Sequence, residues 1–384
     1  MEKNEEKKAI IVATIVGFIT SFEMNNIKLL QQLGYQVSCA TNLDKDNHPD
    51  KIELLKNSGV RLYHIPFSRA PFTKQNIRAY KELRKLMHEE QFDLIHCHTP
   101  VGGVLGRMAA HKEHVPCIIY TAHGFHFYDG APLKNWLVFY PIEKYLSRYT
   151  DVLVTINKED YKRATEKFHA KKTAYVPGVG VDIDKFAPRQ SGRERIRAEL
   201  GLKDTDTMLL SVGELNENKN HTSVIKALSG SNLTYVVVGK GDKETELNAL
   251  AKEYAVDLRL TGYRNDVADF YDAADVYILP SIREGLNVSL MEAMASGLPV
   301  ACGRIRGNVD LIADEDCLFN PTDVKGIEKA IQYVLENKKK LSQTNLQKIK
   351  SFDLSIVKEK ASEIYAGGGV RTPETSFKKA EEET

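Results

Sequence analysis

Short apolar runs that alternate with longer amphipathic segments are the feature that most constrains the fold of this chain. In the first half these runs are rich in β-branched residues, and we predict strands at 10–16, 36–40, 93–98, 117–122 and 151–156. A helical pattern follows each of them. Strands that alternate with helices form parallel sheets covered on both faces, so the pattern predicts a doubly wound α/β fold.

The alternation is interrupted at residues 174–188, where two prolines and two glycines prevent any regular element. Beyond this interruption we predict a second series of strands, at 207–213, 233–239, near 257–261, 275–280 and 299–303. A chain of 384 residues is long enough for two domains of this kind. We therefore expect two doubly wound domains that face each other across a cleft.

We place the domain boundary inside this interruption, so that the domains span 1–180 and 181–350. A C-terminal helix over 351–365 is expected to pack back toward the first domain. The tail, 366–384, has almost nothing to bury and is expected to be disordered.

Charge and cysteine content exclude several classes of protein. The formal net charge is +1, so no overall positive field favours nucleic acid as a partner. The five cysteines are scattered and lack metal-type spacing, which favours a reducing compartment. The apolar run at 9–18 is too short to span a bilayer, and mixed charges precede it where a secretory signal would be basic. We expect a cytoplasmic protein.

Charged side chains in the second half follow predicted strands. Lys219 and Arg264 each come shortly after a strand, and Glu284 and Glu292 follow the strand at 275–280. Ligands in open α/β sheets bind beyond the carboxyl ends of the strands. A helix that begins between Asn287 and Ser289 would present free N–H groups there, which suits a phosphate.

A structural role for Glu292 remains an alternative at this point. Ser289 and Glu292 have the spacing of a capping box, in which the glutamate bonds back to the start of the helix and does no chemistry. That role does not account for Glu284 or for the position of Lys219 after its own strand.

The segment EGLNVSLMEAMASGLPVA, 284–301, resembles the E-x7-E segment of family 4 glycosyltransferases, retaining enzymes with two Rossmann-like domains in the GT-B arrangement. VGELNENKN resembles the phosphate loop of that family, YVPGVGVDIDKFAP its interdomain linker, and GYRNDVADFYDAADVYILPS the run that leads into the glutamate loop. TAHGFHFYDG and DVLVTINKED resemble amino-domain segments of capsule and exopolysaccharide members. The resemblance covers most of residues 9–365.

The resemblance implies roles for individual residues. Glu292 would hold the ribose hydroxyls of the nucleotide, Glu284 the transferred sugar, and Lys219 the pyrophosphate. In the first, acceptor-side domain, His123 would lie near the sugar and the acceptor. The catalytic residues expected on this basis are Glu284, His123 and Lys219, and the expected donor-binding residues are Lys219, Glu292, Arg264, Asn287, Val288, Ser289, Gly285 and Gly213.

The chain departs from the family at Glu214, where an arginine usually follows the glycine of the phosphate loop. A carboxylate there would repel a pyrophosphate, so it either turns away or is compensated by Arg264, Arg304 or Arg306. No convincing D-x-D metal loop is present, and we expect no metal and no resident cofactor. The side chains of His96, Cys97 and His98 are not expected to converge on a metal, since adjacent strand residues point to opposite faces.

The function that the resemblance implies is retaining transfer of a hexosyl or N-acetylhexosaminyl group from a nucleotide-sugar, expected to be a UDP-sugar, to a lipid-linked glycan in surface polysaccharide assembly. A sugar-nucleotide epimerase and a weakly active binding subunit remain alternatives. The expected partners include an anionic membrane surface, contacted by two basic segments at 73–93 and 134–149. In the first, Ile77, Tyr80, Leu83 and Met87 form an apolar stripe, and Lys74, Arg78, Lys81 and Lys85 a basic one. The enzyme would then lie on the inner face of the cytoplasmic membrane.

Overall fold

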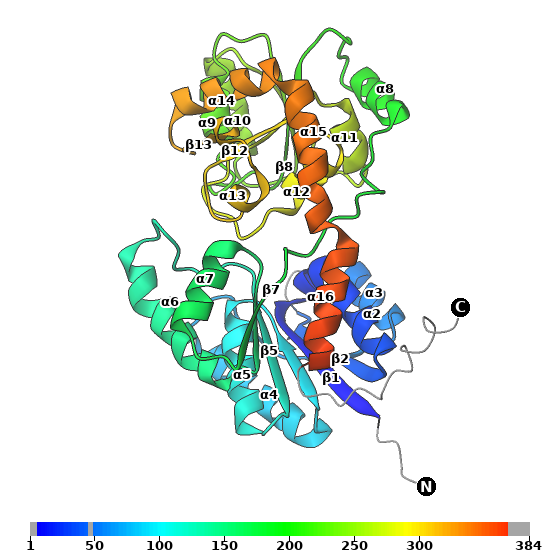
Figure 1. The fold of residues 1–384 in the computed structure, drawn as a ribbon, viewed down its shortest axis with the longest axis vertical. Helices are drawn as coiled ribbons and strands as arrows, with labels where there is room; N and C mark the ends of the chain where they lie inside the picture. The colour runs from blue at the N-terminus through cyan, green and yellow to red at the C-terminus, as the bar shows by residue number, and fades with distance from the viewer. Residues whose placement is uncertain (1–5, 45–48, 368–384) are drawn as a thin grey trace, which may run out of the picture. The chain divides into compact units, whose positions relative to one another are not determined.

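A computed structural model describes residues 6–44 and 49–367 of the chain. The chain forms two compact units. The first comprises the described residues up to Ile156, then Asp160–Val176, and the described residues from Lys358. The second comprises Asn157–Glu159 and Pro177–Val357. Each unit is a twisted sheet with helices on its two faces (Figure 1), so the predicted fold class is confirmed.

The sheet of the first unit has seven parallel strands in the order β3-β2-β1-β4-β5-β6-β7. The strands are β1 Lys7–Ile15, β2 Tyr35–Asn42, β3 Arg61–His64, β4 Leu94–Cys97, β5 Cys117–Ala122, β6 Val152–Thr155 and β7 Lys172–Tyr175. The helices are α1 Val16–Phe18, the π-helix η1 Ile19–Glu23, α2 Met24–Gln32, α3 Pro49–Asn57, α4 Lys74–Glu90, α5 Pro100–Lys112, α6 Leu133–Leu146, the 3₁₀ turn η2 Ser147–Tyr149 and α7 Lys158–Lys167. Strand order reverses between β1 and β4, which is where an open α/β sheet binds its ligands.

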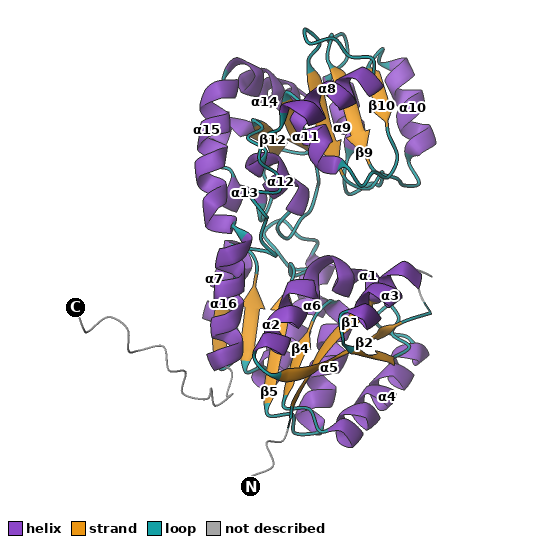
Figure 2. Ribbon diagram, turned by 90° about the vertical axis from the view of Figure 1, so that its right-hand side faces the viewer, coloured by secondary structure: helices purple, strands orange, loops and turns teal. Residues whose placement is uncertain are grey.

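The second unit has six parallel strands in the order β10-β9-β8-β11-β12-β13. Figure 2 labels β9, β10 and β12 of this sheet, with strands drawn in orange. The strands are β8 Met208–Val212, β9 Thr234–Val238, β10 Asp257–Leu260, β11 Val276–Leu279, β12 Val300–Gly303 and β13 Leu318–Phe319. The helices are α8 Gln190–Glu199, α9 His221–Ala227, α10 Glu244–Glu253, α11 Val267–Ala273, α12 Val288–Ala295, α13 Asn308–Leu311, α14 Val324–Glu336 and α15 Lys338–Ile349, with 3₁₀ turns η3 Glu315–Cys317 and η4 Lys350–Phe352. Here strand order reverses between β8 and β11.

Three strands were not predicted from the sequence, and all three lie at sheet edges. β3 and β7 close the two sides of the first sheet, and β13 closes one side of the second. β3 and β7 are partly exposed along their length, so neither needs the continuous apolar run that marks a strand covered on both faces. β13 is buried but only two residues long.

Glycines allow helix α5 to approach the first sheet closely. A Cβ atom at Gly103 would lie 2.5 Å from the Tyr120 ring, and one at Gly106 would lie 2.6 Å from the Cys97 sulfur. Larger residues at these positions would push α5 away from β4 and β5. The start of α5 therefore stays near the carboxyl ends of those strands, where His98 and His123 follow.

The final helix, α16 Leu354–Gly367, begins in the second unit, and its residues from Lys358 belong to the first. The tail expected to be disordered from 366 is helical at its first two residues, and from 368 it lies outside the described residues. Within the described part of the chain, no helix combines the length and apolar character needed to cross a membrane.

The predicted apolar stripe of α4 is partly wrong. The buried face consists of Asn76, Ala79, Leu83, Leu86 and Met87, whereas Ile77 is 60% exposed. The reason is Asn76, whose amide donates to the carbonyl oxygens of Ala70 and Pro71 and so directs this turn inward. Carboxylates on the same helix pair with part of the basic stripe, since Arg78 bonds Glu82 and Lys85 lies 3.7 Å from Glu89.

Candidate functional site

Two loops of the second unit bring a lysine and a glutamate into contact. Lys219 follows β8, and Glu284 follows β11, the strand paired with β8. The Lys219 Nζ lies 2.8 Å from the Glu284 Oε1, and both side chains remain partly accessible, at 17% and 16% exposure. The pair therefore lies at the carboxyl edge of the sheet, at the point where strand order reverses.

The loop after β8 is shaped around Lys219. A Cβ atom at Gly213 would lie 2.9 Å from the Lys219 Cε, so a larger residue at this position would clash with the lysine side chain. Asn216 accepts a hydrogen bond from the Lys219 backbone N–H, and its amide donates to the Glu214 carboxylate at 2.7 Å. The exposed Glu214 is thus hydrogen-bonded within its own loop. This agrees with the first of the two possibilities, in which its carboxylate turns away from the phosphate site.

Helix α12 begins at Val288, within the range predicted, but its cap differs from the capping-box alternative. The N-cap is Asn287, whose side-chain oxygen accepts from the Leu290 N–H at 3.0 Å. The Ser289 hydroxyl lies instead 3.1 Å from the Val212 carbonyl oxygen. The capping-box interpretation of Ser289 and Glu292 is therefore wrong, because another residue already caps the helix.

Glu292 directs its carboxylate toward Tyr271 on the neighbouring helix α11. The Tyr271 hydroxyl donates to Glu292 Oε2 at 2.8 Å. Burial raises the pKa of Glu292, while the Tyr271 bond and the positive charge of Lys185 oppose that rise. Tyr271 itself is buried. Tyr271 was not predicted from the sequence, since nothing in the local pattern marks it as the partner of a glutamate 21 residues away.

The three arginines considered as a second cation have different surroundings. Arg264 is bound by the carboxylates of Glu199 and Asp266, and these hydrogen bonds raise its pKa. Arg304 pairs with Glu315 on the surface. Arg306 is 7% exposed, and its guanidinium lies 3.4 Å from the backbone oxygen of Glu284.

Arg306 is therefore the arginine placed beside the glutamate loop. The following residue, Gly307, has a φ of +83°, and a Cβ atom there would lie 2.0 Å from the Gly285 oxygen. This close backbone contact holds the loop of Gly285 against the segment that carries Arg306. It explains why a glycine is required at 307, a position that was not predicted from the sequence.

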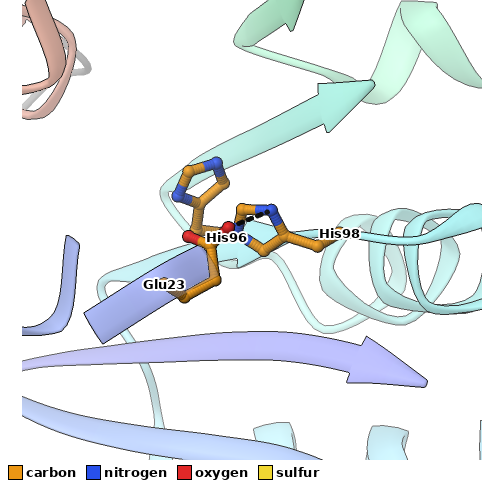
Figure 3. Close-up of side chains that lie close together, drawn as sticks. All are labelled: Glu23, His96 and His98. Atoms are coloured by element: carbon orange, nitrogen blue, oxygen red, sulfur yellow. Dashed lines mark ion pairs between the residues drawn. The ribbon is translucent and has the colours of Figure 1, made fainter. Parts of the chain in front are cut away.

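In the first unit, His123 follows β5 and lies at the accessible edge of a buried polar cluster, with its side chain 21% exposed. Its Nε2 lies 3.2 Å from the His98 Nδ1, and the same His98 nitrogen lies 3.2 Å from Glu23 Oε1 (Figure 3). Burial lowers the pKa of His123 to about 4, so the ring is neutral near neutral pH. The His98 side chain is only 1% exposed, so it is part of this cluster together with Glu23.

His96 on β4 and His98, the first residue after that strand, lie two residues apart and so share one face, where Glu23 meets them (Figure 3). Donor atoms of these three side chains lie within 4.8 Å of one another, the spacing of a group that could hold a metal ion. Glu23 was not predicted from the sequence as a member of this group. However, both ring nitrogens of His96 are already occupied, by the hydroxyls of Tyr365 and Thr121. A metal bound by His96 would have to break one of these hydrogen bonds.

A cavity of about 300 Å³ lies beside His123 in the first unit. Its lining is mostly apolar and aromatic: Pro71, Phe72, Thr99, Pro100, Val101, Val104, Leu105, Tyr120, His123, Gly124, Phe125, His126, Phe127, Phe139, Ile142 and Glu143. Glu143 is bonded by the buried Arg107 at 2.7 Å, which neutralises the carboxylate. The cavity thus favours an apolar group close to a neutral histidine.

Proteins of known family resemble both halves of the chain. The model for glycosyl transferases group 1 matches residues 192–350, and that for the glycosyl transferase 4-like domain matches 16–157. "Putative glycosyltransferase EpsD" of Bacillus subtilis is 36% identical over 319 residues, which is 80% of this chain and 81% of that protein. The UDP-Gal:alpha-D-GlcNAc-diphosphoundecaprenol alpha-1,3-galactosyltransferase of Escherichia coli is 30% identical and covers 73% of this chain and 76% of its own length.

Solved structures agree on the fold. HepE of Anabaena, crystallised with UDP and glucose, has a TM-score of 0.77 at 17% identity and covers 94% of this chain and all of its own. WaaG, described as a glycosyltransferase of lipopolysaccharide biosynthesis, has a TM-score of 0.68 at 19% identity, with 94% of this chain and 100% of its own covered. With the matched family models and the two close relatives, this fold shows that the chain belongs to the family 4 glycosyltransferases of the GT-B class.

Proposed function

We propose that this glycosyltransferase moves a sugar from a UDP-sugar to a lipid-linked glycan acceptor during surface polysaccharide biosynthesis, with retention at the anomeric carbon. The observation that carries the proposal is the Lys219–Glu284 pair at the carboxyl edge of the second sheet. A cation for the leaving diphosphate and a carboxylate for sugar hydroxyls are held there in hydrogen-bond contact.

The donor binds to the second unit through charge and hydrogen bonds. Departure of UDP builds negative charge on the phosphate oxygens, and Lys219 supplies a fixed positive charge. The first turn of α12 adds N–H groups that lack intrahelical partners, at Val288 and Ser289. Arg306 is the second cation beside the glutamate loop, which leaves Arg264 a structural role.

Glu292 and Glu284 hold the two sugars of the donor. Glu292 accepts from the ribose hydroxyls while Tyr271 fixes its orientation. Glu284 releases Lys219 to the diphosphate and accepts from hydroxyls of the transferred hexose or N-acetylhexosamine. These groups address the charge of the leaving diphosphate, so we propose metal-independent transfer without a resident cofactor.

The acceptor binds to the first unit. The apolar cavity beside His123 suits the lipid portion of a lipid-linked glycan, and the Escherichia coli relative is named for an acceptor of that class. Phe72 on the cavity wall is 80% exposed, and Leu133 and Leu137 of α6 are 73% and 68% exposed. Apolar side chains of this kind, with the basic residues of α4, suit peripheral contact with an anionic membrane on its cytoplasmic face. Nucleic acid has no place in this function.

The test is incubation of the protein with a panel of nucleotide-sugars, with and without a lipid-linked glycan. Release of UDP that depends on the acceptor, with sugar recovered in the lipid fraction, is expected. Conversion of the sugar-nucleotide without acceptor would mean epimerisation instead, and binding of nucleotide without any turnover would mean a binding subunit. A glycan of the same structure without its lipid serves as the control for the apolar cavity and should react more slowly.

A further inference from the structure

The buried cluster of the first unit connects Glu23 to His123 through one shared atom. His98 Nδ1 lies 3.2 Å from Glu23 Oε1 and 3.2 Å from His123 Nε2, whereas Glu23 Oε1 and His123 Nε2 are 3.9 Å apart. The direct distance between Glu23 and His123 is too long for a hydrogen bond. Any influence of Glu23 on His123 therefore passes through His98.

The contact between the two histidines requires one hydrogen atom between two ring nitrogens. An ionised Glu23 can only accept, so His98 then carries its proton on Nδ1. That one hydrogen is shared between Glu23 Oε1 and His123 Nε2, which must be an acceptor. The proton of the neutral His123 ring is in that case on Nδ1. A protonated Glu23 instead donates to the single lone pair of His98 Nδ1. A bare His123 Nε2 would set a second lone pair against that nitrogen, so the arrangement without this repulsion has the His123 proton on Nε2.

The other nitrogen of His98 supports the first arrangement. Among the described residues, His98 Nε2 has no hydrogen-bond partner although it is buried. An orphaned buried N–H donor costs about 1–3 kcal/mol and is rarer than an orphaned acceptor. A proton on Nδ1 avoids this cost, because Nε2 is then only a lone pair.

We propose that Glu23, acting through His98, determines which ring nitrogen of His123 carries the proton, and so whether His123 offers the reacting sugars a hydrogen-bond donor or an acceptor. Glu23 and His98 are positioning residues in this proposal, which rests on the proposed role of His123 in transfer. With Glu23 ionised, His123 presents Nδ1–H as a donor. With Glu23 protonated, it presents the Nδ1 lone pair.

The local fold holds these groups in place. Glu23 ends the π-helix η1, an irregular turn of a kind often found at functional sites. Its second oxygen accepts from the Asn26 amide at 2.7 Å, which fixes the carboxylate plane. The Phe18 ring packs edge-on against His123 with centroids 4.9 Å apart, so rotation of the imidazole meets a steric barrier.

The surroundings of Glu23 bring its pKa close to neutral pH, so its carboxyl group can change protonation state there. Burial raises its pKa to about 7, and the Asn26 hydrogen bond opposes this rise. The titratable groups that face it are Cys39 on β2, His96 and His98 at β4, His123 after β5 and Tyr365 on α16. Burial keeps the thiol and the phenol neutral and lowers the pKa values of the histidines, so these groups bring no full charge to the cluster near neutral pH.

Nitrogen-15 NMR of the full-length protein, labelled at histidine, tests the proposal directly, because a protonated ring nitrogen and a bare one differ strongly in chemical shift. The His123 signals are assigned from their loss in His123→Gln. At a pH well above the Glu23 pKa of about 7, wild type should carry the His123 proton on Nδ1. Glu23→Gln should carry it on Nε2, since the new amide accepts from Asn26 with its oxygen and donates to His98 with its nitrogen. An identical His123 tautomer in both proteins would overturn the proposal.

The unmodified protein gives a second measurement that needs no variant. Lowering the pH through about 7 should move the His123 proton from Nδ1 to Nε2 in wild type and leave Glu23→Gln unchanged. A tautomer that does not respond to pH contradicts the proposal. So does a spectrum that changes on adding Zn²⁺ or EDTA, because the cluster would then be a metal site.

Kinetics separate a positioning role from a purely structural one. Glu23→Gln should lower kcat about 10–100-fold at high pH, as loss of an orienting partner typically does, while the KM for the donor changes little. The exposed Glu166→Gln, on α7 of the same unit, is the matched control and should behave as wild type. Loss of fold in Glu23→Gln with normal specific activity of the remaining folded protein would contradict the positioning role. If His123→Gln turns over normally, the role of His123 in transfer fails, and the tautomer measurement still decides the proposal.

Discussion

Replacing Lys219 by alanine tests the donor site at the residue on which the proposed function most depends. In the structure the Lys219 ammonium is held 2.8 Å from Glu284 and is 17% exposed. In the proposed function, donor binding exchanges that carboxylate for the diphosphate, so the lysine charge would be preorganised where negative charge develops. The alanine variant removes this charge and leaves Glu284 facing the diphosphate.

The expected loss of turnover follows from that placement. Removal of one preorganised donor to a developing negative charge costs about 2.7–4 kcal/mol, which is roughly a 100–1,000-fold lower kcat. The uncompensated Glu284 carboxylate adds repulsion, so we expect a loss of at least about 100-fold.

Stability should respond much less. A partly accessible ion pair contributes about 0.2–1 kcal/mol, and in a unit of this size 1 kcal/mol shifts Tm by roughly 2–4 °C. Lys219→Ala is therefore expected to melt within about 4 °C of wild type. A normal melt with a large loss of turnover identifies a chemical role.

The assay is acceptor-dependent release of UDP, measured beside thermal melting. Lys226→Ala is the control, because Lys226 is an exposed lysine on α9, close to Lys219 in the sequence, and is not part of the pair. Its turnover should equal that of wild type. Turnover of Lys219→Ala within a few-fold of the control would remove the lysine from the mechanism, and a collapse of Tm would mean that the pair is structural.

Glu292→Gln is expected to weaken UDP binding, since a hydrogen bond to a charged acceptor is worth about 1.5–3 kcal/mol. Glu284→Gln should preserve or tighten UDP binding, because Lys219 then has no carboxylate that competes with the diphosphate. Titration calorimetry compares the two, and equal losses would contradict the assignment of ribose to one and hexose to the other. Anionic liposomes at low salt should bind wild type, and changing three basic residues of α4 together to glutamate should abolish that binding without affecting UDP: Arg78, Lys81 and Lys85. A wild-type protein that ignores such liposomes would make α4 a solvated surface helix. Burial raises the pKa of Glu23 from 4.5 to about 7, so its contribution to stability is complete below 4.5 and is lost as the pH rises through about 7. The loss in folding free energy is about 3 kcal/mol. Melts recorded across this pH range should show stability falling with pH in wild type, and Glu23→Gln should remove that fall. If the variant shows the same fall, another group causes it.

Local pattern in the sequence was enough to predict the two sheets and the positions of the charged loops. Continuous apolar runs mark the central strands, because parallel strands covered on both faces must be apolar along their whole length. On this basis Lys219 and Glu284 were predicted to follow strands. In the structure Lys219 follows β8 and Glu284 follows β11. The strands β3, β7 and β13 were missed, since two are half-exposed edges and the third is two residues long.

The partners of the site residues were decided by tertiary structure. Glu284 meets Lys219 across 65 residues, and Glu23 meets His98 although 75 positions separate them. Asn287 rather than Ser289 caps α12, which frees Glu292 to bind Tyr271. These contacts depend on which strands are neighbours and on their register, and no local pattern in the chain encodes either. The sequence therefore determined which charges reach the carboxyl edges of the sheets, and the packing of distant segments decided what each charge binds there.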